Sequence, residues 1–131
     1  MTGLDTNVLV RYVMQDDAKQ SPKASMLIEA LTVDAPGFVS LVSIVELVWV
    51  LSYSYGLARE QVAEVLELLL RTKEVVVDRA DQVLKALRAF EASSADFADC
   101  LIERIAASAG CTRTMTFDVA AAKTAGMTLI R

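Results

Sequence analysis

Short apolar runs alternate with longer helical patterns along this chain, and that alternation limits the folds it can adopt. The apolar runs lie at residues 2–5, 38–41, 74–78, 112–117 and 127–131. Helical patterns fill the segments between them. Strands that alternate with helices are typical of a parallel sheet covered by helices. We therefore expect an α/β fold, with a small central and mostly parallel sheet of four to five strands flanked by helices.

The chain has the length and composition of one globular domain, which we expect to span residues 1–131. Hydrophobic residues make up 54% of it and charged residues 23%, which is unlike a disordered protein. No apolar stretch approaches the roughly 20 residues that a membrane span requires. The two cysteines, Cys100 and Cys111, are too few for a disulfide framework, so we expect free buried thiols and a cytoplasmic location.

The charge balance excludes some kinds of chemistry. With 13 basic and 17 acidic residues the net charge is −4, which does not favour a broad basic surface for nucleic acid. An RNA substrate would need another source of positive charge, and divalent cations are the obvious one.

The chain has no histidine, so catalysis based on histidine triads, histidine bases or histidine–metal sites is excluded.

One glutamate stands in the middle of an apolar run, "SIVELVWVL" at residues 43–51. A helix through this run has apolar residues all round it, and such a helix is normally buried. Burying an ionised carboxylate costs several kcal/mol unless a positive group meets it. Glu46 is therefore expected to be protonated, paired with a basic residue or bound to a metal ion.

Four further acids fall at positions where ligands of parallel α/β sheets bind. Asp5 follows the first predicted strand and Asp118 follows the strand that ends at residue 117. Asp96 and Asp99 are three residues apart at the start of a predicted helix, so they share a face. If these acids converge with Glu46, they need cations, and Mg²⁺ or Mn²⁺ suits a set of oxygen ligands.

Each acid also has a structural explanation. Asp5, Asp96 and Asp118 stand where a helix N-cap is expected, and Asp99 would then lie in a favourable first turn. Glu46 could be half of a buried ion pair. The set as a whole is harder to explain by capping than its members are, because one acid lies inside an apolar helix.

Four segments together resemble the PIN-domain family, and in particular the bacterial VapC-type ribonuclease toxins. These segments are "LDTNVLVRY", "VELVWVL", "ADFADCLI" and "TFD", in that order along the chain. The resemblance implies a PIN-like fold and a Mg²⁺- or Mn²⁺-dependent endoribonuclease that hydrolyses RNA. It also implies that the protein is the toxin of a toxin–antitoxin pair, inhibited by a cognate antitoxin. A catalytically inactive PIN-like interaction module is the alternative.

Residue roles follow from the same resemblance. It implies a catalytic and metal-binding set of five acids: Asp5, Glu46, Asp96, Asp99 and Asp118. Asp5 and Asp99 would be metal ligands and Glu46 the acid of the helix, with Asp96 as an additional acid and Asp118 as the fourth acid of the family pattern, which in relatives can act through water. Thr6, Asn7 and Thr116 would orient these carboxylates. Cys100 stands where relatives usually carry a small residue such as alanine.

Other features bear on partners. The apolar helices predicted at 42–55 and 58–72, together with the resemblance, lead us to expect a homodimer. Trp49, Tyr53 and Tyr55 lie on or near the first of these helices, and core packing is the default expectation for them. Arg11 follows Asp5 by six residues and either contacts phosphate or pairs with a local acid.

Overall fold

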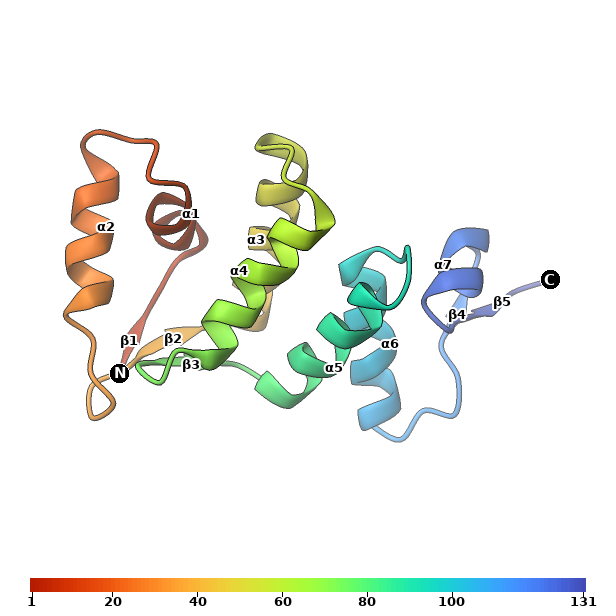
Figure 1. The fold of residues 1–131 in the computed structure, drawn as a ribbon. Coiled ribbons are helices and arrows are strands. Elements are labelled where there is room, and N and C mark those ends of the chain that lie inside the picture. The colour runs from red at the N-terminus through yellow and green to blue at the C-terminus, as the bar shows by residue number, and fades with distance from the viewer. The chain divides into compact units, whose positions relative to one another are not determined.

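A computed structural model describes all residues, 1–131, and divides them into two compact units. The first unit comprises Met1–Asp78 and the second Arg79–Arg131. Figure 1 shows the elements of both units, each of which is described by itself below. No helix in either unit has both the length and the apolar character needed to cross a bilayer.

The first unit contains three short parallel strands and four α-helices. Its strands pair in the order β1-β2-β3, with Thr2 opposite Gly37 and Val39 opposite Val77. In chain order the elements are β1 (Thr2–Gly3), α1 (Thr6–Met14), α2 (Gln20–Glu29), β2 (Gly37–Val39), α3 (Leu41–Trp49), the π-helical turn η1 (Val50–Ser54), α4 (Arg59–Arg71) and β3 (Val75–Val77).

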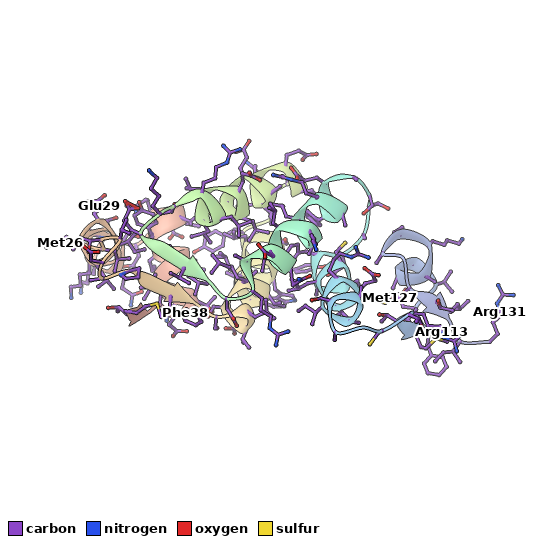
Figure 2. The ribbon with its side chains drawn as sticks, turned by 90° about the horizontal axis from the view of Figure 1, so that it is seen from below. Met26, Glu29, Phe38, Arg113, Met127 and Arg131 are labelled. Atoms are coloured by element: carbon purple, nitrogen blue, oxygen red, sulfur yellow. The ribbon has the colours of Figure 1, made fainter.

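The core of the first unit forms where α1, α3 and α4 bury their apolar residues. Leu9, Ile44, Leu47, Val62 and Leu66 are almost completely buried. Helix α4 thus has one buried apolar face, formed by Val62, Leu66 and Leu69. Helix α1 packs against both α2 and α3. Met26 and Glu29 lie on the outer side of α2, and Met26 is exposed (Figure 2).

The second unit pairs two helices and adds a small two-stranded parallel sheet. Its elements are α5 (Ala80–Glu91), α6 (Phe97–Ser108), β4 (Met115–Thr116), α7 (Val119–Thr124) and β5 (Thr128–Leu129). Phe90 of α5 meets Phe97 of α6 edge-on, with ring centroids 5.8 Å apart. Buried Val83, Leu87 and Leu101 complete this interface.

The expected α/β class and parallel pairing are confirmed. All five strands pair in parallel, but they fall into one sheet of three and one of two, where a single sheet of four to five strands was expected. The strands are also shorter than the predicted apolar runs, with two or three residues each. Neither cysteine forms a disulfide, as expected, but Cys111 is exposed and only Cys100 is buried.

Candidate active site

The first unit places Asp5 and Glu46 next to the carboxyl ends of two paired strands. Asp5 follows β1 and is the N-cap of α1, where its Oδ1 accepts a hydrogen bond of 2.8 Å from the amide of Thr6. Glu46 lies in the middle of α3, the helix that follows β2. Because β1 and β2 are parallel, α1 and α3 leave the sheet at the same edge.

A threonine hydroxyl links these two helices. Oγ1 of Thr6 donates a hydrogen bond of 2.7 Å to Oε1 of Glu46, across 40 residues of sequence. Thr6 is buried, so this hydroxyl has little access to water as an alternative partner. The contact fixes the Glu46 carboxylate relative to the N-terminus of α1, where Asp5 lies.

The burial predicted for the helix around Glu46 is wrong on one face. Glu46 is exposed, and so are Val42, Trp49 and Tyr53, which follow the same side of α3 and η1. The core is made by the opposite side, with Ile44, Leu47 and Leu51. Glu46 therefore needs no buried basic partner, and the expectation that Trp49 and Tyr53 pack in the core is also wrong.

A pocket of about 460 Å³ opens beside the two acids. Asp5, Thr6, Asn7, Val10 and Arg11 line it from α1 and its N-cap, and Glu46, Val50, Ser54 and Tyr55 line it from α3, η1 and the residue that follows η1. The π-helical turn ends at Ser54 and brings Tyr55 to the rim of the pocket. Gly56, with φ of +65°, then ends the helix at the residue where the sequence predicted its end.

Arg11 is the basic residue of this pocket, and it has a local acid nearby. Its Nη1 lies 3.6 Å from Oδ1 of Asp16 and donates to the Tyr55 hydroxyl at 3.4 Å. The Tyr55 hydroxyl in turn donates to Oδ2 of Asp16 at 2.9 Å, and this hydrogen bond is the main cause that raises the pKa of Tyr55. Of the two roles expected for Arg11, pairing with a local acid is present.

The second unit contains the other three acids. Asp96 is the N-cap of α6, and its Oδ1 accepts from the amide of Ala98 at 2.8 Å. Asp118 is the N-cap of α7, and its Oδ1 accepts from the amide of Ala120 at 2.8 Å. The capping role that the sequence allowed for these residues is therefore present in the structure, as it is for Asp5.

Asp99 lies in the first turn of α6 and differs from the two capping aspartates. Its burial raises the pKa of its carboxyl, and the negative charges of Asp96 and Asp118 raise this pKa further. Asp96 and Asp118 therefore lie close enough to Asp99 for their charges to disfavour its ionised form. Oγ1 of Thr116 accepts a hydrogen bond of 3.0 Å from the amide of Asp118 and fixes the start of α7 next to them.

Capping leaves part of each carboxylate open. Asp5, Asp96 and Asp118 bond helix amides through Oδ1 only, and Glu46 accepts from Thr6 through Oε1 only. The second oxygen of each of these four residues makes no hydrogen bond. A hard divalent cation prefers such oxygens, so the donor chemistry fits Mg²⁺ or Mn²⁺. Neither unit by itself brings three or more acid or thiol side chains together around one point.

The network of Arg11, Asp16 and Tyr55 was not foreseen from the sequence. Asp16 and Tyr55 are 39 residues apart, and nothing in the local pattern around either residue indicates their contact. Arg11 and Tyr55 were noted separately, without a relation between them. Asn7 is exposed and lines the pocket. Of the three residues expected to orient the acids, it is the one that makes no hydrogen bond with an acidic residue.

Comparison with known proteins identifies the family. The PIN domain model matches residues 4–127, which covers nearly the whole chain and both units. No curated protein matches the chain. PIN domains are generally nucleases that act on RNA and typically use divalent metal ions. The match contains all four segments on which the resemblance was based, and the chain therefore belongs to the PIN-domain family.

Proposed function

We propose that this protein is a Mg²⁺- or Mn²⁺-dependent endoribonuclease and the toxin of a toxin–antitoxin pair. The observation that carries the proposal is the open oxygen on each acid, because capping and hydrogen bonding use only one oxygen of Asp5, Glu46, Asp96 and Asp118. A carboxylate oxygen without a hydrogen bond is free to bind a divalent cation. Membership of a nuclease family supports the same conclusion.

We further propose that residues 1–131 act as one PIN domain whose acids bind the metal. The family match supports this, since it runs across both units without a break. Asp5, Glu46 and Asp99 would bind the metal, and Asp96 and Asp118 would add negative charge and a further oxygen each. A bound Mg²⁺ or Mn²⁺ supplies an activated water and stabilises the charge that develops on the phosphodiester.

The chain's own residues then have distinct roles in this reaction. Thr6 holds the Glu46 carboxylate through its 2.7 Å hydrogen bond, so this ligand is oriented before the metal binds. Asp5, Asp96 and Asp118 are fixed by the helix amides that they cap. Asn7 offers an amide at the pocket wall for contact with the substrate or the metal shell.

Cleavage of RNA tests the catalytic proposal. Purified protein, freed of any antitoxin, should cut structured RNAs into discrete products with Mg²⁺ or Mn²⁺ and should not cut them with excess EDTA. An Asp5→Asn variant purified in the same way controls for contaminating ribonucleases, because Asn still caps α1 but removes the charge. Equal cleavage with EDTA would refute the metal mechanism. No cleavage across a broad panel of cellular RNAs would favour the inactive interaction module.

The proposed partners are an antitoxin and a second copy of the chain. Val42, Trp49 and Tyr53 form an exposed apolar stripe on α3 and η1, with the rings of Trp49 and Tyr53 5.6 Å apart. Exposed apolar stripes of this kind are typical of interaction surfaces. Light scattering should give a dimer, and replacing both Trp49 and Tyr53 by serine should weaken it. A clean monomer for the unchanged protein at high concentration would contradict the homodimer.

The toxin role has its own test. Expression of the chain in bacteria should arrest growth through cleavage of cytoplasmic RNA, and Asp99→Asn should remove the arrest. Co-expression of a short reading frame that neighbours the gene and encodes the antitoxin should restore growth. Growth that continues with the active protein at full expression would contradict the role as a toxin.

A further inference from the structure

Because the chain is acidic overall, the few basic side chains near the acids indicate where RNA phosphates can bind. RNA brings a negative phosphate at each nucleotide, and the protein has a net charge of −4. Among the nine residues that line the acid pocket, Arg11 is the only one with a positive charge. The lining of this pocket therefore offers RNA two carboxylates, those of Asp5 and Glu46, and one guanidinium.

The side chain of Arg11 is held in place at one edge and open at the other. Its Nε donates a hydrogen bond of 2.7 Å to Oε1 of Gln20, and its Nη1 faces the Tyr55 hydroxyl at 3.4 Å. Nη2 makes no hydrogen bond. The guanidinium is half-buried, so its orientation is constrained while the N–H groups of Nη2 remain available to a phosphate.

We propose that Arg11 binds a backbone phosphate of the RNA next to the phosphate that is cleaved, with Tyr55 and Gln20 holding the guanidinium in position. This inference rests on the proposed nuclease function and adds a positioning residue to it. A guanidinium recognises a phosphate through parallel N–H donors, which a fixed and partly open arginine provides. The phosphate contact carries no base specificity, so it would serve any RNA sequence.

In the protein without RNA, the Asp16 carboxylate is only weakly paired with the Arg11 guanidinium, at the place proposed for the phosphate. Its Oδ1 is 3.6 Å from Nη1 of Arg11, beyond hydrogen-bond distance, and both side chains are partly exposed to solvent. Such a pair contributes little to stability. Oδ2 of Asp16 is bonded to the Tyr55 hydroxyl, which keeps the carboxylate at the rim of the pocket. A phosphate that binds Arg11 competes with this carboxylate, so Asp16 lowers the affinity for RNA.

A second hollow gives the direction in which the RNA continues. It has a volume of about 260 Å³, lies along α1 and α2, and shares Asn7 and Arg11 with the acid pocket. Lys23 of α2 lines it and supplies a second positive charge. The RNA would thus run from the acids, over Arg11, toward Lys23.

Binding of RNA without cleavage tests this inference. The full-length protein is titrated into a labelled single-stranded RNA in EDTA, and fluorescence anisotropy is measured over a series of salt concentrations. Arg11→Gln should weaken binding roughly tenfold at low salt. It should also reduce the slope of log affinity against log salt by about 0.7, because one phosphate contact is lost. Asp16→Asn should strengthen binding.

Arg71→Gln is the matched control. Arg71 lies on α4, is highly exposed and pairs with Glu67 four residues earlier, so its loss removes the same charge from another surface. Thermal melts of all variants show whether Arg11→Gln is folded, and the salt slope separates a phosphate contact from a structural role. Arg11→Lys keeps the charge and should retain part of the affinity and the full slope.

The outcomes are distinct from those of the cleavage assay. If Arg11→Gln and Arg71→Gln have the same affinity and salt slope, or if the unchanged protein binds no RNA even at the lowest salt, the inference is wrong. If cleavage fails but Arg11→Gln still lowers RNA binding and its slope, the proposed metal chemistry is wrong and the phosphate site stands.

Discussion

In the first unit a hydrogen bond joins the two helices that carry the acids, whereas in the second unit burial and two neighbouring negative charges raise the pKa of one acid. In the first unit Thr6 joins the α1 terminus that Asp5 caps to Glu46 on α3. In the second unit Asp96 and Asp118 cap their helices, but their charges raise the pKa of Asp99, which is already raised by burial. In the first unit the Glu46 carboxylate is oriented before a metal ion binds. In the second unit the ionised form of Asp99 is disfavoured, and a bound cation would relieve this cost.

The largest effect, on RNA cleavage, should come from two single variants that each remove one negative charge, one in each unit. Asp5→Asn and Asp99→Asn keep the side-chain shape, and asparagine still caps a helix at position 5. Each variant should lose roughly a thousandfold in RNA cleavage, about 4 kcal/mol of transition-state stabilisation. Single-turnover rates with saturating Mn²⁺ measure this loss. Wild-type rates for both variants at limiting Mn²⁺ would show that these residues are not the ligands.

A smaller loss is expected when the hydroxyl that orients Glu46 is removed. Thr6→Val keeps the volume but deletes the 2.7 Å hydrogen bond, so the carboxylate loses its fixed orientation. Activity or metal affinity should fall by roughly 10- to 100-fold.

Thr116→Val is the matched variant in the second unit. Its hydroxyl only accepts from the amide of Asp118, so its loss leaves the carboxylate itself bonded to the α7 amides. The rate of Thr116→Val should stay closer to that of the unchanged protein. Equal losses for both variants would remove the distinction between the two groups of acids.

The sequence predicts the capping acids well, because capping depends on local order along the chain. Asp5, Asp96 and Asp118 each precede a helical pattern, and each caps the helix as its position allowed. It predicts the exposure of Glu46 poorly. Apolar residues surround Glu46 on all sides of the helix, so the hydrophobic periodicity does not indicate which side faces solvent. In the structure Val42 and Trp49 are nevertheless exposed.

Long-range contacts are the part that the sequence could not supply. The pairing of Tyr55 with Asp16, and of Thr6 with Glu46, depends on how α1 and α3 pack against each other. The π-helical turn that brings Tyr55 to the pocket has no recognised sequence pattern either. Family resemblance indicated the acids but gave no reason to connect Arg11 with Tyr55.

A change in Glu46 should affect stability only when metal is present. Glu46 is exposed, and glutamine at this position can still accept the Thr6 hydrogen bond, so Glu46→Gln should alter the free energy of unfolding in EDTA by less than about 0.5 kcal/mol. If metal affinity falls tenfold, the stabilisation gained in Mn²⁺ should be about 1.4 kcal/mol smaller than for the unchanged protein. Denaturant melts in EDTA and in Mn²⁺ measure both quantities. A loss of several kcal/mol in EDTA would mean that Glu46 is structural.

The smallest effect is the one that Asp99 has on the stability of the metal-free protein, and its sign depends on pH. Because the folded pKa of Asp99 is raised, ionising this carboxyl costs more in the folded protein than in the unfolded chain. The stability that this group contributes is therefore full below the ordinary carboxyl pKa of 3.8 and is lost as the pH rises through the raised value. Asparagine cannot ionise, so in EDTA Asp99→Asn should melt slightly above the unchanged protein at neutral pH.

That advantage should disappear as the pH falls below the ordinary carboxyl range, and saturating Mn²⁺ should reverse it, because only the ionised carboxylate binds the metal. Thermal melts of both proteins across this pH range, with and without Mn²⁺, give the four curves needed. Glu46→Gln is the companion variant, with an exposed carboxylate that is held by a hydroxyl. If Asp99→Asn melts below the unchanged protein in EDTA at neutral pH, the repulsion attributed to the second group of acids does not destabilise the fold.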